Sequence, residues 1–324
     1  MSKINNPQMQ RWEKFLGLFR EKVARSSEDR PTVRYWRSTD LVGAINDIKK
    51  EHGQELVLST FPAAKAALER LEKIGWIKLI PVVWRDAEER TGPQLYRVSL
   101  DERADSSIDA LELLQGNRSD GIICYFGALR FYELTTQFPP FYHIARLRSG
   151  APPIPENIPV EVKPPDPAKR LYNPLGTEVF TWGETKFYET RRYRSLIPGI
   201  QVRLISARSG LRITTLEQSI LDTLSHPIHC GGDSVVFEAW EKALDRVDSD
   251  RLLSYLETID STDLWRRTAV MLKLTEIPTA GTRLAAAIEA KQKTLNDSSN
   301  IPEINLLPGY EFGQLDGSWR VRVP

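Results

Sequence analysis

The sequence predicts an α+β protein: an N-terminal winged helix-turn-helix followed by a mixed α/β domain whose second half is a helical bundle. Three observations support this prediction. Apolar residues recur three times at helical spacing within residues 1–75, and two strand-like segments follow. A Pro-rich stretch flanked by short β-prone segments occupies the middle of the chain. Capped amphipathic segments then follow one another closely over residues 211–274.

Length and composition indicate a globular protein of two or three domains. The chain has 324 residues, of which 41% are hydrophobic and 27% charged, as is typical of globular domains. We expect a winged-helix domain at 1–100 and a second domain at 101–324, with an α/β part at 118–210, a helical part at 211–293 and a terminal strand at 315–324. No apolar run has the length of a membrane span or a secretory signal, which predicts a cytoplasmic protein. The two cysteines, Cys124 and Cys230, are therefore expected to be buried free thiols.

Charge is unevenly distributed along the chain. Residues 1–100 contain 18 Lys and Arg against 13 Asp and Glu, whereas the whole chain has a net charge of +1. This asymmetry favours an N-terminal domain that faces nucleic acid. An excess of this size also occurs in proteins of other kinds, so it carries little weight alone.

The first hundred residues predict three helices and two strands. The first helix covers 8–25. The second begins at Ser38 or Thr39 with Gly53 as its left-handed C-terminal residue, and the third begins at Ser59 or Thr60. The buried stripe of the third helix is Ala64, Ala67, Leu68, Leu71 and Ile74, and Gly75 ends it. Residues 76–85 and 94–100 are predicted as two strands joined by a polar loop. This layout is that of a winged helix-turn-helix.

In that layout the third helix is the recognition helix, because its outward face enters the major groove and its N-terminal amides meet phosphate. The residues predicted to contact DNA are Ser59, Thr60, Lys65, Ala66, Arg70 and Lys73 on or before this helix, and Arg85 and Arg90 in or beside the wing. The alternative is that these charges only solvate an exposed helix. Glu69 and Glu72 weaken the positive field, and the segment before the third helix is longer than the tight turn of a standard helix-turn-helix.

The middle of the chain is predicted to be mixed α and β. Candidate strands lie at 121–123, 140–146, 177–182, 186–190 and 201–206, and the Pro-rich stretch 146–171 is predicted as an extended connection. Within ETRRYRSL, Arg191, Arg192 and Arg194 alternate with tyrosines. Such a patch can stack bases or bind phosphate, or bind a partner, although the same residues can equally line a solvated strand face.

Residues 211–274 predict four capped helices. Thr214 and Glu217 have the spacing of a capping box. Further caps are expected at Asp233 or Ser234, at Asp248 or Ser249, and at Ser261, whereas Pro227 and the Gly231–Gly232 pair end the first of these helices. Beyond them, a helix at about 279–293 and a strand through Trp319, Val321 and Val323 complete the chain.

No complete catalytic set is recognisable in the sequence. His226, His229 and Cys230 are crowded together without a distant ligand pair, which fits structural zinc poorly. Glu184 and Lys186, with Asp166 or Glu178, have the E-x-K pattern of metal-dependent nucleases, yet such short strings arise by chance. No phosphate-binding Gly-rich loop is present. We therefore predict no catalytic residues, no metal and no cofactor, and retain the nuclease as a minor alternative.

Three segments together are similar to a known family. These are TTLEQSILD at 214–222, HPIHCGGDSVVFEAW at 226–240 and DRLLSYLETIDSTDLWRRTAVML at 250–272, and DGIICYFGALRFYELTTQFPPFYHIA at 120–145 adds a fourth. The pattern resembles that of the AbiEi-type antitoxins of bacterial type IV toxin-antitoxin (abortive infection) systems. The resemblance covers about half of the chain, roughly residues 118–275, without a single invariant signature.

The resemblance implies a phage-defence antitoxin that also represses transcription. Its N-terminal winged helix would bind inverted repeats in its own promoter, and its C-terminal domain would oppose a nucleotidyltransferase-like toxin without forming a stable complex with it. A stand-alone winged-helix transcription factor is the main alternative. Operator binding without rescue of a neighbouring toxic gene would distinguish that alternative.

Overall fold

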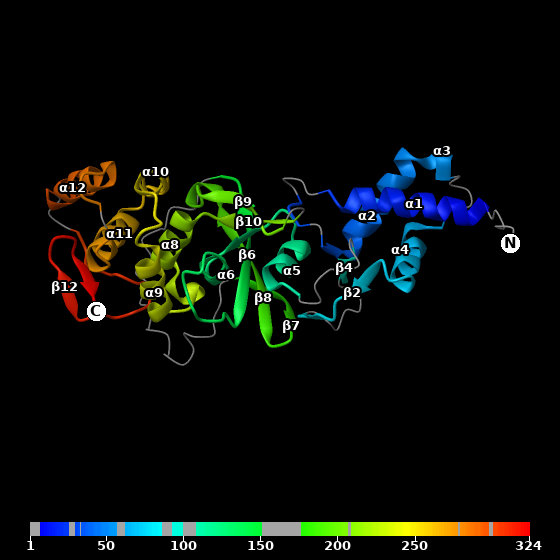
Figure 1. Cartoon of the computed structure of the whole chain (residues 1–324). Coiled ribbons are helices and arrows are strands. Elements are labelled where there is room, and N and C mark those ends of the chain that lie inside the picture. The colour runs from blue at the N-terminus through cyan, green and yellow to red at the C-terminus, as the bar shows by residue number, and fades with distance from the viewer. Residues whose placement is uncertain are drawn as a thin grey trace. The chain divides into compact units, whose positions relative to one another are not determined.

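We analysed a computed structural model, which describes residues 7–25, 30–32, 34–56, 62–85, 93–99, 108–150, 176–206, 209–277, 279–297 and 301–324. The predicted α+β class is confirmed, because helices and strands are mixed along the chain (Figure 1). Contacts divide the chain into two compact units. Unit 1 comprises Met1–Gly121, Phe180–Gly183 and Val202–Arg212, and unit 2 comprises Ile122–Val179, Glu184–Gln201 and Ile213–Pro324.

Unit 1 begins with helices packed around an aromatic core. α1 (Pro7–Val23) lies beside α2 (Ser38–Glu51), which in turn contacts α4 (Ala64–Lys73), as Figure 1 shows. On α1 the rings of Trp12, Phe15 and Phe19 stack in sequence, with centroid separations of 5.1 and 5.9 Å. The helical spacing that predicts α1 therefore gives one apolar face, and the described part of the unit buries that face.

The helix ends of unit 1 differ from the prediction at two residues. Gly53 is the first residue of a short helix, α3 (Gly53–Leu56), and the C-cap of α2 is His52. Ile74 is the C-cap of α4 and is 45% exposed, so it does not belong to the buried stripe. Gly75 ends α4 as predicted, with a φ of 80° that favours glycine. The long segment before α4 thus contains an additional helical turn.

Unit 1 also contains a three-stranded antiparallel sheet. Its strands are β1 (Tyr35–Arg37), β4 (Leu95–Val98) and β2 (Ile77–Leu79), in that order. Residues 76–85 form two strands rather than one, because β3 (Val83–Trp84) pairs instead with residues 180–181. The sheet therefore includes β1, a three-residue strand that the sequence did not predict.

Unit 1 extends beyond the predicted boundary at residue 100. α5 (Ala110–Asn117) packs against β1 so closely that a Cβ built on Gly116 would lie 2.4 Å from Tyr35 Cβ. Glu112 on α5 is fully buried, and its carboxylate accepts hydrogen bonds from Thr32 Oγ1 at 2.9 Å and from the Ser209 hydroxyl. These contacts place α5 and the segment Val202–Arg212 in unit 1.

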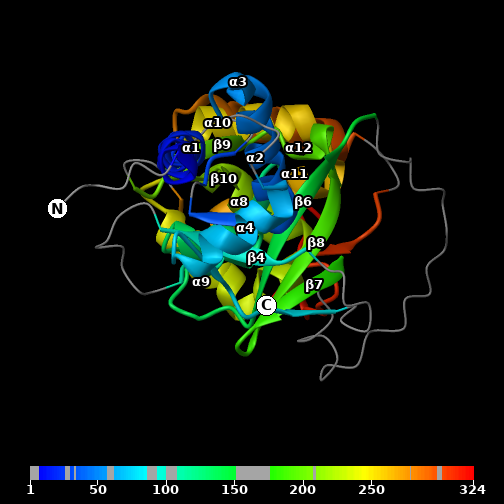
Figure 2. The same cartoon turned by 90° about the vertical axis from the view of Figure 1, so that its right-hand side faces the viewer.

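Part of a mixed parallel and antiparallel sheet forms the centre of unit 2. β8 (Thr185–Tyr193), β6 (Phe141–Arg148) and β5 (Ile122–Cys124) are neighbours in that order and belong wholly to unit 2. The other strands, β7 (Thr177–Trp182), β9 (Ile200–Leu204) and β10 (Gly210–Thr214), each have residues in both units. β6 and β8 are parallel and pair over eight residues, and Figure 2 shows these two long strands side by side. The predicted strands are thus confirmed, with shifts of at most three residues at their ends.

Helices cover this sheet and account for most of the core of unit 2. They are α6 (Phe126–Phe131), α8 (Leu216–Ser225), α9 (Asp233–Ala243), α10 (Ser249–Ile259), α11 (Thr262–Leu274) and α12 (Arg283–Asn296), with short 3-10 turns η1 (Arg194–Leu196) and η2 (Pro227–Cys230). α8 contacts α9, α10 and α11. The first of the predicted capped helices, α8, therefore lies at the centre of the helical packing.

The caps of these helices agree with the prediction at two positions and differ at two. Asp248 and Ser261 are N-caps: the Asp248 carboxylate accepts from the Asp250 and Arg251 amides at 3.1 Å each, and Ser261 Oγ accepts from Leu264 at 3.3 Å. The N-cap of α8 is Thr215 rather than Thr214, because Thr214 ends β10. Gly232, rather than Asp233 or Ser234, is the N-cap of α9 and provides no side-chain cap.

The C-terminus forms a small sheet held by a buried arginine. β11 (Ile304–Asn305), β13 (Val321–Val323) and β12 (Gln314–Asp316) are adjacent in that order. Arg266 of α11 is 1% exposed, and its guanidinium donates to the carbonyls of Trp319, Pro302 and Arg320 at 2.8 Å each.

None of the helices in the described ranges combines the length and apolar character needed to cross a membrane.

Candidate functional site

The outward face of α4 in unit 1 is exposed and carries three cationic side chains. Ala64, Ala67, Leu68 and Leu71 point into the core, which leaves Lys65, Ala66, Glu69, Arg70 and Lys73 exposed. Within the described ranges, no carboxylate forms an ion pair with Lys65, Arg70 or Lys73. The guanidinium of Arg70 lies over the Trp12 ring at 4.1 Å from its centroid, which supports the arginine while leaving it at the surface.

The other residues predicted to contact DNA are only partly described. Arg85 is exposed at the end of β3. Ser59, Thr60 and Arg90 lie outside the described residues. The start of α4 is fixed by Ala63 as N-cap and by Lys49, whose Nζ donates to the Pro62 carbonyl at 3.2 Å. Four of the predicted residues therefore share the exposed surface of α4.

In unit 2, the patch predicted from ETRRYRSL is divided between the surface and the interior. Arg191 and Arg194 are exposed, but Arg192 is 8% exposed and forms a bidentate ion pair with Asp222, which is 1% exposed. Arg192 Nη1 and Nη2 each lie 2.6 Å from a carboxylate oxygen of Asp222. Gln218 Nε2 donates to Asp222 Oδ1 at 2.9 Å. The prediction is thus wrong for Arg192, because neighbouring strand residues point to opposite faces of the sheet.

The guanidinium of Arg192 remains charged despite its burial. Burial would lower the pKa of Arg192, but the Asp222 carboxylate raises it above the ordinary arginine value. Two short parallel hydrogen bonds give the strongest arrangement open to an arginine and a carboxylate. Removing only one partner would leave the other charge uncompensated inside the unit.

Aromatic and histidine rings surround this ion pair. The Arg192 guanidinium lies 5.0 Å from the centroid of Tyr125, a residue with a φ of 57° at the turn from β5 into α6. The Tyr125 ring contacts His226 and His229 with centroid separations of 5.4 and 5.5 Å. Burial raises the pKa of Tyr125, so its phenol remains protonated. The side chains therefore form one packed layer beside the ion pair.

Both histidines of this layer are neutral near pH 7. Burial, followed by the nearby charge of Arg192, lowers the pKa of His226 to about 3 and that of His229 to about 4. Cys124 and Cys230 are buried free thiols, as predicted, and burial raises the pKa of Cys124 to about 12. Within the described ranges, no group of His, Cys, Asp and Glu side chains is arranged to hold a metal ion.

A pocket of about 350 Å³ opens next to the ion pair. Its lining residues include Arg191, Arg192, Asp222 and Arg267. Arg267 of α11 is partly buried, and its Nε donates to the Asn305 carbonyl at 3.0 Å. No carboxylate of the described residues forms an ion pair with Arg267. The pocket lining therefore contains more positive than negative charge.

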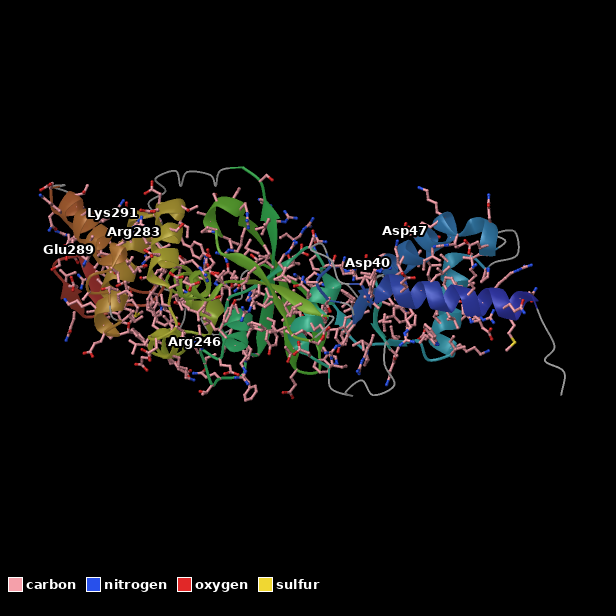
Figure 3. The ribbon with its side chains drawn as sticks, turned by 45° about the horizontal axis from the view of Figure 1, so that its top comes forward. Asp40, Asp47, Arg246, Arg283, Glu289 and Lys291 are labelled. Atoms are coloured by element: carbon pink, nitrogen blue, oxygen red, sulfur yellow. The ribbon has the colours of Figure 1, made fainter. Side chains whose placement is uncertain are left out.

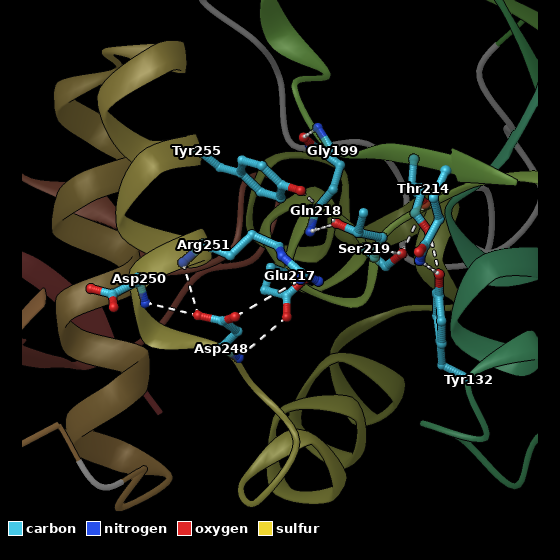
Figure 4. A network of polar contacts seen from close by, with 12 residues as sticks. Tyr132, Gly199, Thr214, Glu217, Gln218, Ser219, Asp248, Asp250, Arg251 and Tyr255 are labelled. Carbon is cyan, nitrogen blue, oxygen red and sulfur yellow. Dashed lines mark hydrogen bonds and ion pairs between the residues drawn. The ribbon is translucent and has the colours of Figure 1, made fainter. Parts of the chain in front are cut away.

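Buried hydrogen bonds fix the helices that surround this pocket. Glu217 on α8 is 2% exposed and accepts from the Asp248 amide at 3.2 Å and from Arg251 Nη1 at 3.4 Å, which ties the start of α10 to α8 (Figure 4). On the side of the sheet, Tyr132 donates to the Thr214 carbonyl at 2.7 Å (Figure 4). These bonds join α8 to α10, and Tyr132 to the end of β10.

The residues of the nuclease alternative do not converge on one point. Glu184 is exposed between the ends of β7 and β8. Lys186 Nζ lies 3.4 Å from the Glu178 carboxylate, and Asp166 lies outside the described residues. The described geometry thus gives Lys186 an ion-pair partner without assembling a pair of carboxylates that would hold a metal.

Sequence reasoning missed Gln218, Asp222 and Arg267 as members of one site. Gln218 and Asp222 are four residues apart on α8, a spacing that places both on the same face of a helix. Arg192 comes from a strand and Arg267 from a later helix. The sequence shows the helical spacing of Gln218 and Asp222. It does not show that β8, α8 and α11 come together.

Comparisons with known proteins add little to this geometry. No protein-family model matches the chain, and no curated protein does either. The chain is similar to a crystal structure of the RV2827C protein from Mycobacterium tuberculosis, with 13% sequence identity and a TM-score of 0.46 over 95% of this chain and 90% of that chain.

Proposed function

We propose that the chain is a cytoplasmic transcriptional regulator that binds promoter DNA through a winged helix-turn-helix in unit 1. The observation that carries this proposal is the exposed α4 face with Lys65, Arg70 and Lys73, next to a three-stranded antiparallel sheet. Apart from the short elements α3 and β3, the order α1, β1, α2, α4, β2, β4 is the order expected of a winged-helix protein. Exposed lysines and arginines that lack carboxylate partners are suited to phosphate contacts.

The same surface has features that limit its field. Glu69 lies on the exposed face of α4, and Glu72 is exposed on its flank. Negative side chains near DNA phosphates reduce affinity. We therefore expect binding of moderate affinity with a clear dependence on salt.

A gel-shift titration tests DNA binding. The probe is the double-stranded DNA immediately upstream of the gene, at low salt, and the variant combines Lys65→Glu with Lys73→Glu. Arg283→Glu with Lys293→Glu on α12 is the matched control, because it reverses the same number of charges at exposed positions of unit 2, and Figure 3 shows Arg283 on that helix. We expect the wild type and the control to shift the probe and the α4 variant to lose most of the shift. Absence of a wild-type shift, or equal shifts for both double variants, would contradict the proposal.

For unit 2 we propose an antitoxin activity against a nucleotidyltransferase-like toxin, without a stable complex between the two proteins. This part rests on the AbiEi-like sequence pattern at 118–275, and that segment contains β5, α6, β6 and the helices from α8 to α11. Co-expression with the product of the adjacent reading frame tests it. Restored growth supports the proposal. A toxic neighbour whose effect persists in the presence of this chain would leave the stand-alone transcription factor as the better interpretation.

A further inference from the structure

We propose that a second pocket of unit 2 binds a small organic cation of the alkylammonium class, with Phe138 and Asp233 as its main contacts. We call it the aromatic pocket, because Phe126, Phe138, Phe141 and Tyr310 line it together with Asp233 at the start of α9. Its volume of about 410 Å³ lies within the range of small-ligand sites. The lining residues all belong to unit 2, so the inference does not depend on DNA binding by unit 1.

The charge of the aromatic pocket fits a cation. Asp233 is the one charged residue of its described lining, which contains no Lys, Arg or His. The Asp233 carboxylate accepts a hydrogen bond from the Ser234 amide at 2.8 Å, and no cationic side chain of the described residues forms an ion pair with it. A negative charge of this kind attracts a cationic ligand and opposes the entry of an anion.

Phe138 offers the most accessible aromatic surface of the pocket. Its side chain is 81% exposed, although it is a large apolar residue. The guanidinium of Arg130 lies 4.8 Å from the centroid of this ring, but Arg130 does not line the pocket. The surface that Phe138 presents to the pocket is therefore not covered by Arg130. Aromatic faces attract alkylammonium groups, and because the charge of Arg130 weakens this attraction, Asp233 should contribute the larger share.

Polar contacts hold Phe138 in place before any ligand binds. Glu238 of α9 accepts hydrogen bonds from Thr135 Oγ1 at 2.7 Å and from the amide and hydroxyl of Thr136 at 2.9 Å each. The loop that leads to Phe138 is thus attached to the helix that provides Asp233. A binding site whose groups are already ordered loses little conformational entropy when the ligand binds.

The floor of the aromatic pocket is apolar and closely packed. Phe126 and Phe141 are both buried, and their rings meet edge to face with a centroid separation of 6.3 Å. A Cβ built on Gly231 would lie 2.7 Å from the Phe126 ring, so only glycine allows this approach. An apolar floor favours the alkyl groups of an organic cation, whereas an inorganic cation would lose its hydration there.

A ligand-observed NMR titration of the full chain tests this proposal with benzyltrimethylammonium as the probe. Benzyl alcohol has the same ring without a charge, and benzenesulfonate has the ring with a negative charge. Asp233→Asn removes the carboxylate, and Glu241→Gln is the matched control, because Glu241 is exposed on the same helix and lies outside the lining. Phe138→Leu removes the exposed ring, and Phe138→Tyr keeps one. Thermal unfolding checks that each variant is folded.

We expect benzyltrimethylammonium to bind the wild type, with benzyl alcohol and benzenesulfonate at least about tenfold weaker. Asp233→Asn should weaken binding about fivefold to tenfold and Phe138→Leu about threefold to fivefold, whereas Phe138→Tyr and Glu241→Gln should change it less than about twofold. Failure of the probe to bind at millimolar concentration would overturn the assignment. Equal affinity for benzyl alcohol, equal effects of Asp233→Asn and Glu241→Gln, or unchanged binding by Phe138→Leu would do the same.

Discussion

The two units use their charged side chains in different ways. In unit 1, Lys65, Arg70 and Lys73 stand at the surface of α4, away from any described ion-pair partner. In unit 2, Arg192 and Arg266 are buried and bound to a carboxylate or to carbonyls. Glu112 is the exception in unit 1, because it is buried beneath Thr32 and Ser209.

This difference separates charges that are free to bind a partner from charges that the fold requires. An exposed lysine can be reversed at little cost, since the charge is already solvated. A buried guanidinium cannot lose its partner without leaving an uncompensated charge. Substitutions of Arg192, Asp222 and Arg266 should therefore affect stability, and those on α4 should affect binding.

The largest effect is expected from breaking the Arg192–Asp222 pair. Asp222→Ala leaves a buried guanidinium without its carboxylate and should lower the free energy of unfolding by about 3–5 kcal/mol. Urea denaturation followed by circular dichroism measures the loss, and hydrogen exchange assigns it to unit 2. Combining Arg192→Met with Asp222→Leu removes both charges and should recover much of the loss. A loss below about 1 kcal/mol for Asp222→Ala would show that the pair is not needed for folding.

A somewhat smaller effect is expected for Arg266. Arg266→Leu removes three bonds to the carbonyls of Trp319, Pro302 and Arg320. We expect a loss of about 2–4 kcal/mol, since buried carbonyls are left unsatisfied. Hydrogen exchange should rise selectively at 301–323, the residues of the C-terminal sheet. Lys293→Gln on α12 is the control, because Lys293 is exposed and makes no bond to this sheet among the described contacts, and it should leave exchange there nearly unchanged. Unchanged protection of the sheet in Arg266→Leu would contradict the role we assign to Arg266.

The pH dependence of stability tests the histidine layer. The pKa of His226 is lowered from 6.5 to about 3 and that of His229 to about 4, in both cases first by burial. Below pH 6.5 the unfolded chain binds protons that these folded histidines do not, so stability falls as the pH is lowered towards about 4. From pH 6 to pH 5 we expect each residue to remove about 1.2 kcal/mol, so that the pair removes about 2–2.5 kcal/mol.

His226→Gln is the variant that isolates this effect. It should remove about half of the fall in unfolding free energy between pH 6 and pH 5, because His229 remains and contributes the other half. Urea denaturation at several pH values provides the measurement. An unchanged slope in the variant would mean that His226 is not buried as a neutral ring.

The smallest effect on stability is expected for α4. Lys65→Glu with Lys73→Glu should change the free energy of unfolding by less than about 0.5 kcal/mol, because both side chains are exposed. Thermal unfolding of the wild type and the variant checks this expectation. A large loss would mean that these lysines support the fold, as Arg192 and Arg266 do in unit 2.

Much of the fold was predictable from local sequence. The helical spacing of Trp12, Phe15 and Phe19 predicted α1, and the caps Asp248 and Ser261 predicted the starts of α10 and α11. These signals depend on neighbouring residues, so one sequence suffices to see them. β1 was missed because three residues are too few to show a period of two, and its pairing with β4 is a distant contact.

Of the two candidate sites, one was predictable from local sequence and the other was not. The exposed face of α4 follows from the position of its apolar stripe, and Lys65, Arg70 and Lys73 are on the side predicted for them. The pocket of unit 2 joins Arg192 of β8, Asp222 of α8 and Arg267 of α11, and no local pattern brings these three together. Strand alternation could have placed Arg191 and Arg192 on opposite faces, but the partner of the buried arginine is set only by tertiary packing.

The dependence of DNA affinity on salt concentration tests the central claim most directly. Fluorescence anisotropy with the upstream DNA gives the binding constant of the wild type and of Lys65→Glu with Lys73→Glu across a series of salt concentrations. If both lysines contact phosphates, the slope of log K against log salt should become less negative by about 2, at about 0.9 per lost contact. An unchanged slope, or no binding by the wild type at the lowest salt, would contradict DNA recognition through α4.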